Sequence, residues 1–369
     1  MRTVRRLFYR DIVSSVGFVA LAFLSLFFFI DFVEELGDVG KGYTLLHATA
    51  YSLLQAPGHL YELMPIAVLI GTIYALARLA QSSEYTILRT GGLGPGRALA
   101  LLAGLGLSFA LTTYVVGDWI APFSERQATE LQARAKGKLR IGSAGAWLKD
   151  RASTPQGERS YSVNVGSSGI DGTLQDVRIF EFDSDGRLVQ RIGAATARIA
   201  DDDTWQLGDV RLTHWNTAAG ASQAVASEEK LSTLAWHSSL SAGVVAAAVL
   251  PLSTMSTIEL FRYIGHLADN EQAAQRHEIQ FWKRALYPFA CLVMMALALP
   301  FAYMHARAGG VSFKVFAGIM LGIGFVLLNN MSGHLGLLRN WTPWIAASAP
   351  SALFLLVSLA AFGWLVRYR

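Results

Sequence analysis

The sequence lacks the residue patterns of several large enzyme classes. No GxxxxGK[ST] loop occurs, so the chain has no nucleotide-hydrolysing loop of that type. HExxH, GxSxG and CxxC patterns are also missing, and the eight histidines are scattered without the spacing of a metal site. We therefore expect no catalytic residues, no metal site and no cofactor in this chain.

Cysteine and charge are also scarce. Cys291 is the single cysteine and lies in an apolar run, which excludes an internal disulfide framework. Charged residues make up only 16% of the chain against 53% hydrophobic ones, and mean hydropathy is +0.36, values typical of a membrane protein. The formal charge of +4 does not indicate a nucleic-acid partner, because Lys and Arg form short clusters beside apolar runs.

Six stretches are long and apolar enough to cross a membrane as helices. The first exceeds a signal-peptide core and no small-residue cleavage motif follows it, so we expect a retained anchor. The uncharged segment Tyr43 to Tyr61, which contains Pro57 and Gly58, is interpreted as an interfacial lead-in to the second span. The predicted spans are Ile12 to Ile30, Leu60 to Ala80, Ala98 to Gly117, Ala285 to Met304, Val315 to Gly333 and Asn340 to Val366.

The positions of Arg and Lys predict the orientation of these spans. Basic clusters precede the first span, separate the second from the third and the fourth from the fifth, and end the chain. All of these places fall on one side if six helices alternate. By the positive-inside rule that side is the cytoplasm, which puts both termini there.

The long stretch between the third and fourth spans has the sequence pattern of β-strands. Segments such as "DVRIFEFD" and "TWQLGDVRLTHW" alternate or are rich in β-branched and aromatic residues, and "DSDG" and "NTAAG" mark turns. Many short strands with frequent turns predict an antiparallel sandwich or jelly roll on the outer side of the membrane.

The sequence thus divides into four parts. Residues 1–121 hold spans one to three, 122–250 the β-jelly-roll domain with its lead-in, 251–281 an amphipathic connector, and 282–369 spans four to six. In the connector, Ser256 and Glu259 have capping-box spacing. The predicted fold class is an α-helical membrane protein with six transmembrane helices plus an inserted antiparallel β-jelly-roll domain.

The segment "AQSSEYTILRTGG" between the second and third spans is charged and ends in paired glycines. Ser82 or Ser83 can cap a helix, with Glu84 in its first turn and Arg89 in its last. We predict a short amphipathic cytoplasmic helix over about 82–90. It is either an ordinary interfacial turn or a coupling helix that docks on a cytoplasmic ATPase through Glu84, Tyr85, Leu88 and Arg89.

Three stretches together resemble one family. "LAQSSEYTILRTGG", "GDWIAP" (117–122) and "GAWLKD" (145–150), within six spans around a β domain, are similar to the YjgP/YjgQ permeases, and to their LptG branch more than to LptF. The resemblance covers nearly the whole chain. It implies a non-catalytic permease subunit of the ABC transporter that extracts lipopolysaccharide from the bacterial inner membrane, with Glu84 at the family's coupling-helix glutamate.

The same resemblance implies the partners. These are an LptF-like permease, an LptB-like ATPase dimer, the jelly-roll proteins LptC and LptA, and lipopolysaccharide itself, with the β domain in the periplasm. Two alternatives stay open. The chain could be the LptF-like half or another lipid or lipoprotein permease, or it could be a membrane-anchored sensor or scaffold.

Contacts with lipopolysaccharide are less sharply indicated. A site for acyl chains and phosphates combines apolar helix faces with basic residues, and the family has bases just after the first span. This chain has acids there, including Asp31, with one base, Lys41. The candidate contacts are therefore Phe27, Asp31, Lys41, Arg126, Arg134 and Lys136, supplemented by Lys138, Arg140, Lys283 and Arg284. Ordinary headgroup anchoring is the alternative for each base.

Overall fold

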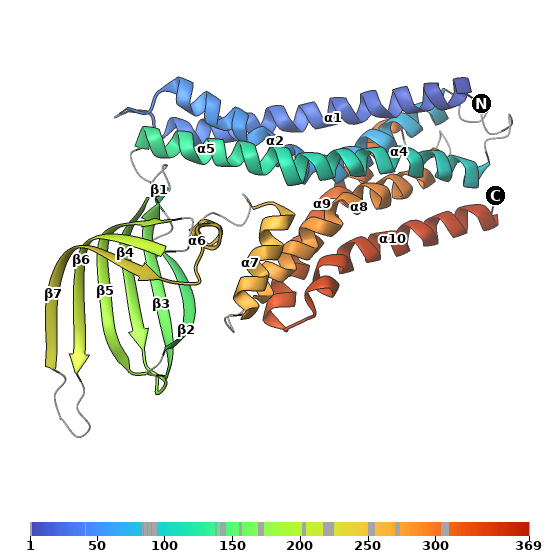
Figure 1. Ribbon diagram of the computed structural model, residues 1–369. Coiled ribbons are helices and arrows are strands. Elements are labelled where there is room, and N and C mark those ends of the chain that lie inside the picture. The colour runs from blue at the N-terminus through green and yellow to red at the C-terminus, as the bar shows by residue number, and fades with distance from the viewer. Residues whose placement is uncertain are drawn as a thin grey trace. The chain divides into compact units, whose positions relative to one another are not determined.

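The computed structural model describes the chain except residues 1, 41, 83, 85–86, 88–89, 91–93, 137–138, 141–144, 155–156, 169–172, 201–203, 217–224, 250–254, 270–273, 304–309 and 369. The chain forms two compact units (Figure 1). The first contains residues 1–38, 48–125 and 275–369, and the second contains residues 39–47 and 126–274.

Long apolar helices build the first unit. Six candidate membrane spans are found among the described residues, as the sequence predicts. Their shared core consists of apolar side chains such as Leu69, Leu102 and Met294, each fully buried. The helices are α1 (Arg2–Leu36), α2 (Leu45–Gln81), α4 (Pro95–Val115), α5 (Ala121–Lys136, which continues into the second unit), α8 (Gln275–Tyr303), α9 (Val311–Leu338) and α10 (Pro343–Tyr368).

The second span begins earlier than predicted. We expected an interfacial lead-in over Tyr43 to Tyr61, whereas α2 is one helix from Leu45. The lead-in prediction was wrong because Pro57 removes only one backbone donor, and the apolar residues on either side of it continue the helix. A second proline, Pro65, also lies inside α2.

The third span does not end at "GDWIAP". That motif forms a π-helical turn, η1 (Val116–Ile120), between α4 and α5. A π-turn inserts an extra residue into the helical ladder and changes which carbonyls are available as acceptors. The lead-in to the β domain is therefore the continuing helix α5.

The described part of the second unit contains one seven-stranded antiparallel sheet, the helices α6 and α7, and most of α5. Its strands follow the order β2-β3-β4-β5-β6-β7, with β1 also paired to β3, and Figure 1 shows the sheet strongly bent. The elements are β1 (Leu139–Arg140), β2 (Ala146–Thr154), β3 (Gly157–Ser168), β4 (Leu174–Phe182), β5 (Leu188–Ile199), β6 (Thr204–Asn216), β7 (Val225–His237), α6 (Ala242–Val249) and α7 (Thr257–Asp269).

One face of the sheet holds the core of this unit. Leu148, Ile179 and Trp205 are buried there with Val245 of α6, and the Trp205 indole donates to the Leu240 carbonyl across 3.0 Å. We call the opposite side the outer face. The predicted fold class, six transmembrane helices with an inserted antiparallel β domain, is confirmed.

A crease crosses this sheet. The antiparallel pairing is interrupted at one position in each of five neighbouring strands and resumes in the same register on the other side of that position. In β4, β5, β6 and β7 the inward-facing positions switch parity there. In β4, for example, Leu174 and Val177 are both buried while Gln175 and Asp176 between them are exposed. The interrupted positions are Gly166, Asp176, Ala195, Asp209 and Ser232.

Candidate functional site

The segment between α2 and α4 presents an exposed carboxylate. Glu84 is exposed in a helical position, and Ile87 nearby has 67% of its surface exposed. The chain enters α4 through Gly94 in an extended conformation and Pro95 at the first helical turn. The other residues proposed for ATPase docking, Tyr85, Leu88 and Arg89, lie outside the described residues.

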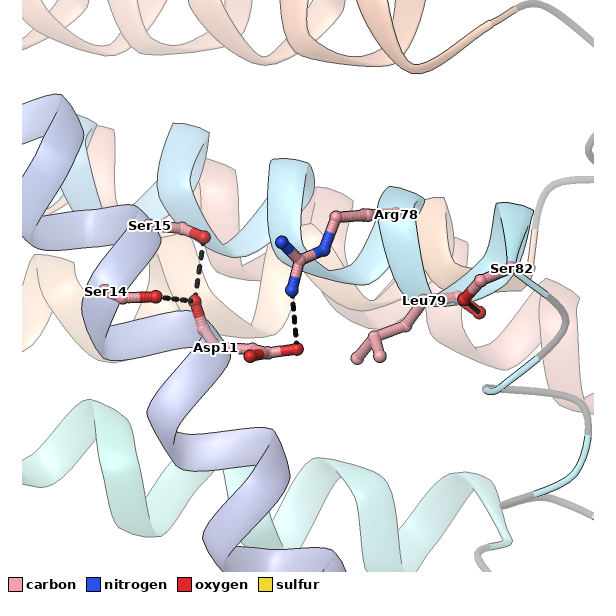
Figure 2. A network of polar contacts seen from close by, with 6 residues as sticks. All are labelled: Asp11, Ser14, Ser15, Arg78, Leu79 and Ser82. Carbon is pink, nitrogen blue, oxygen red and sulfur yellow. Dashed lines mark hydrogen bonds and ion pairs between the residues drawn. The ribbon is translucent and has the colours of Figure 1, made fainter.

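An ion pair lies at the base of this segment. Arg78, in the last turn of α2, donates from Nη2 to Oδ2 of Asp11 in α1 across 2.8 Å (Figure 2). The hydroxyls of Ser14 and Ser15 donate to the Asp11 backbone carbonyl, at 3.1 and 2.7 Å. The contact connects the end of α2 to the N-terminal part of α1, a link that the sequence analysis did not predict.

The N-terminal part of α1, up to Val16, is the part embedded in this unit. Phe8, Ile12 and Val16 recur every four residues along one face and are at most 2% exposed. Gly71 of α2 permits the closest approach, because a Cβ there would lie 2.6 Å from the Val16 backbone. On the α4 side, the Tyr9 hydroxyl donates to the Leu101 carbonyl across 3.0 Å. This N-terminal part of α1 therefore contacts both helices that flank the Glu84 segment.

The remainder of α1 is much more exposed. Phe18, Leu21 and Phe29 have between 61% and 73% of their surface exposed. Near the C-terminal end of α1 there is another polar contact with α2. The Asp31 carboxylate lies 2.7 Å from the His59 imidazole. Phe27 lies against the same imidazole, with 4.8 Å between ring centroids.

Two of the predicted lipopolysaccharide contacts thus meet at one histidine. Phe27 and Asp31 both contact His59, which the sequence analysis did not single out. Lys41 lies outside the described residues. Asp31 is partly buried and already paired, so its carboxylate is directed to α2 rather than left open to solvent.

The predicted basic contacts after the third span lie on α5, in the second unit. Arg126 forms an ion pair with Glu259 of α7, while Arg134 has 69% of its side chain exposed and lies 3.7 Å from Glu130. Lys136 is the last residue of α5. Arg140 is the last residue of β1, and Lys138 lies outside the described residues. Of Arg126 and Arg134, the two whose side chains are described, Arg134 has the more accessible charge.

Glu259 combines two interactions at the start of α7. Its carboxylate accepts from the Ser256 backbone amide across 2.9 Å, and its own amide donates to the Ser256 hydroxyl across 3.3 Å, which is the predicted capping box. Burial alone would raise the pKa of Glu259, but the hydrogen bonds from Arg126 and Ser256 outweigh it and lower that pKa below 4.5.

The two bases at the start of the fourth span are turned into the protein. Arg284 is 8% exposed and donates to the Gly117 carbonyl in η1 across 2.6 Å, and it lies 5.8 Å from the Tyr61 ring. Lys283 donates to the Asn329 carbonyl across 2.6 Å. Gly117 is required at this position because a Cβ would overlap the Tyr61 ring. The "GDWIAP" motif therefore forms an acceptor site for a buried arginine.

Small residues on α9 pack within the chain. A Cβ at Gly318 would lie 2.7 Å from Ile73, and one at Gly322 would lie 2.9 Å from Ile66, so both glycines permit close approach of α2. No group of three or more potential metal ligands is found among the described residues.

Comparison with known proteins identifies one family over nearly the whole chain. A family model described as lipopolysaccharide export system permease LptF/LptG matches residues 6–365. The chain is 29% identical over 357 residues to the permease protein LptG of Escherichia coli K12, covering 95% of each chain. It is 26% identical over 361 residues to LptG of Haemophilus influenzae Rd, covering 97% of each.

Proposed function

The chain belongs to the LptF/LptG family of lipopolysaccharide export permeases, and we propose that a separate cytoplasmic ATPase moves it through the segment that contains Glu84. The chain is a permease of the lipopolysaccharide export system. Its similarity to LptG proteins supports the LptG-like half of the exporter, beside an LptF-like half.

The single observation that carries the ATPase proposal is the exposed Glu84 segment between α2 and α4. The chain has no GxxxxGK[ST] loop, which supports a supply of the energy of ATP from another subunit. An exposed carboxylate and an exposed isoleucine offer a charge pair and an apolar anchor to an ATPase of the LptB type.

The contacts of α1 supply a route for that motion. Displacement of the Glu84 segment would move the end of α2 or the start of α4. The N-terminal part of α1 contacts both helices, at Arg78 of α2 and Leu101 of α4. Because the rest of α1 is largely exposed, it can be displaced at little cost in packing. We place the receiving cavity for acyl chains beside this exposed part of α1, around Phe27.

The β unit would receive the substrate. We propose that it lies in the periplasm, with both termini in the cytoplasm, in a multi-pass protein of the inner membrane. Its order leaves β1 and β2 at one edge of the sheet and β7 at the other, and edge strands can pair with strands of similar domains such as those of LptC and LptA.

Co-purification tests the transporter reading. The detergent-solubilised chain, co-expressed with its LptF-like and LptB-like partners, is expected to retain the ATPase and to release lipopolysaccharide to a jelly-roll acceptor only with ATP. A membrane-anchored sensor or scaffold would instead be isolated without a nucleotide-binding subunit. That result, with all partners expressed, would remove the basis of the proposal.

A further inference from the structure

A polar groove lies on the outer face of the β sheet, opposite the buried core. Its volume is about 630 Å³, and its lining includes side chains and backbone of β4, β5, β6 and β7. The charged residues along it are Arg178, Arg191, Arg211, Lys230, Asp176 and Asp209. Cations thus outnumber carboxylates, although the two kinds are interspersed.

The strand register aligns three of these cations in one row. Arg178 pairs with Gly193, Gly193 with Arg211, and Arg211 with Lys230, across four neighbouring strands. Residues paired in this way project from the same face of the sheet. Since Gly193 has no side chain, a gap separates the side chains of Arg178 and Arg211. A Cβ at Gly193 would meet only the Arg211 carbonyl, at 3.9 Å, so the gap is not filled by a neighbour.

Arg211 and Lys230 form an unfavourable pair in the protein alone. They are direct cross-strand partners, and like charges directly opposite each other destabilise a sheet. Within the described part of the chain, neither forms an ion pair. Both side chains are exposed and can reach a common ligand over the groove.

The other charges of the groove are already engaged or lie at the crease. Arg178 donates to both carboxylate oxygens of Asp176, at 3.3 and 2.8 Å, and Arg191 lies 5.7 Å from the Phe180 ring. Asp176 and Asp209 are interrupted positions of the crease and have positive φ angles of 51° and 50°. Such conformations are costly for residues other than glycine and cluster at functional sites.

We propose that this groove binds a phosphate group, held by Arg211 and Lys230 above the gap at Gly193. The guanidinium fork matches phosphate oxygens and the ammonium supplies a second charge-assisted donor. A bound dianion would also remove the repulsion between these two cations. The site is separate from the apolar face of the sheet and does not depend on the transport role of the chain.

The first test measures binding of inorganic pyrophosphate to the full-length protein in nanodiscs of zwitterionic lipid. Calorimetry should detect saturable binding that Arg211→Gln and Lys230→Gln each weaken about tenfold or more, since a charge-assisted hydrogen bond is lost. Gly193→Val, which fills the gap without changing charge, should weaken it as well. Arg187→Gln, an equal loss of charge in the turn between β4 and β5, is the matched control and should bind normally.

Thermal unfolding separates a lost site from a damaged fold. Without ligand, Arg211→Gln should melt at or above the wild-type temperature, because the like-charge pair is gone. At the same concentration, pyrophosphate should raise the wild-type melting temperature more than that of the variant. No saturable binding by the wild type, or an equal loss in Arg187→Gln, would overturn the proposal.

A second arm distinguishes free phosphate from lipid-borne phosphate. Nanodiscs of anionic phospholipid at matched ionic strength should weaken pyrophosphate binding to the groove by competition if headgroups occupy it. Unchanged affinity would assign the groove to a soluble phosphate.

Discussion

The Arg78 guanidinium lies 2.8 Å from the Asp11 carboxylate, so the last turn of α2 and the N-terminal part of α1 share an ion pair between residues 67 apart in sequence. With 54% of the Arg78 side chain exposed, the pair adds at most about 1 kcal/mol to stability. The ion pair is important for where it lies, because it joins α1 to the last turn of α2, which leads directly into the Glu84 segment.

We expect Asp11→Asn and Arg78→Gln to uncouple ATP hydrolysis from export. Lipopolysaccharide release per ATP hydrolysed should fall several-fold in the reconstituted exporter, while the free energy of unfolding changes by less than about 1 kcal/mol. The charge exchange Asp11→Arg with Arg78→Asp should restore part of the ratio. Ser14→Ala, which loses a hydrogen bond to the same residue but no charge, is the matched control. Failure of the exchange to restore coupling would refute an electrostatic link.

Replacement of Glu84 by Ala or Lys should weaken ATPase docking and impair export. Glu84→Lys should have the larger effect of the two, because it places a cation against the basic residue proposed on the ATPase. The measurement is the amount of ATPase that co-purifies with the membrane subunit, together with export. Asp185→Ala, which removes an exposed carboxylate from the β4–β5 turn, should change neither. Normal assembly and export in the Glu84 variants would exclude the proposed role.

The Arg126–Glu259 pair should make the attachment of α7 depend on pH. Because folding lowers the pKa of Glu259, its contribution to stability is fully present above about pH 4.5 and is lost as the pH falls through the lower, folded-state pKa. Glu259→Gln should therefore lower the melting temperature at neutral pH, and the difference from wild type should shrink as the pH is lowered to about 3. Glu228→Gln on exposed β7 should show no such convergence. A difference that stays constant with pH would contradict this assignment.

A photocrosslinker at Arg134 should capture lipopolysaccharide more efficiently than one at Arg126. Arg134 is largely exposed, whereas Arg126 is occupied by Glu259. Lys136, two residues further along the chain, is also expected to crosslink to lipopolysaccharide. The crosslinking yield is measured in membranes and compared with the yield of a photocrosslinker placed at Arg187 in the β4–β5 turn. If neither Arg134 nor Lys136 gave a crosslink to lipopolysaccharide, while positive controls elsewhere did, these contacts would be contradicted.

Gly117→Ala should destabilise the first unit by overpacking, by about 1–3 kcal/mol. The added methyl group would overlap the Tyr61 ring and shift the carbonyl that accepts from Arg284. Adding Tyr61→Leu to the Gly117→Ala variant should recover part of the lost stability, measured by thermal unfolding. The matched control is Gly96→Ala, where a Cβ has no neighbour within 4 Å. Because Ala is the better helix former, Gly96→Ala should not destabilise the protein. Equal losses of stability at Gly96 and Gly117 would show that overlap with the Tyr61 ring does not decide the cost.

Much of the architecture follows from patterns local in the sequence. Apolar run length predicts six spans because a helix that crosses a bilayer needs a fixed number of residues. Two-residue alternation predicts the β unit, and the spacing of Ser256 and Glu259 predicts the start of α7. The exposed position of Glu84 also follows from the order of charges between two apolar runs.

Contacts between distant residues were decided only by the tertiary structure. No local pattern indicates that Asp31 lies against His59, or that Arg284 donates to the Gly117 carbonyl. The start of α2 was misjudged because proline and glycine punctuate soluble helices more strongly than membrane ones. The row of Arg178, Gly193, Arg211 and Lys230 likewise depends on strand register. Sequence determined the elements, because their hydrogen bonds and hydrophobic periodicity are local. Packing decided the sites, because an ion pair or a groove exists only after distant segments have been brought together.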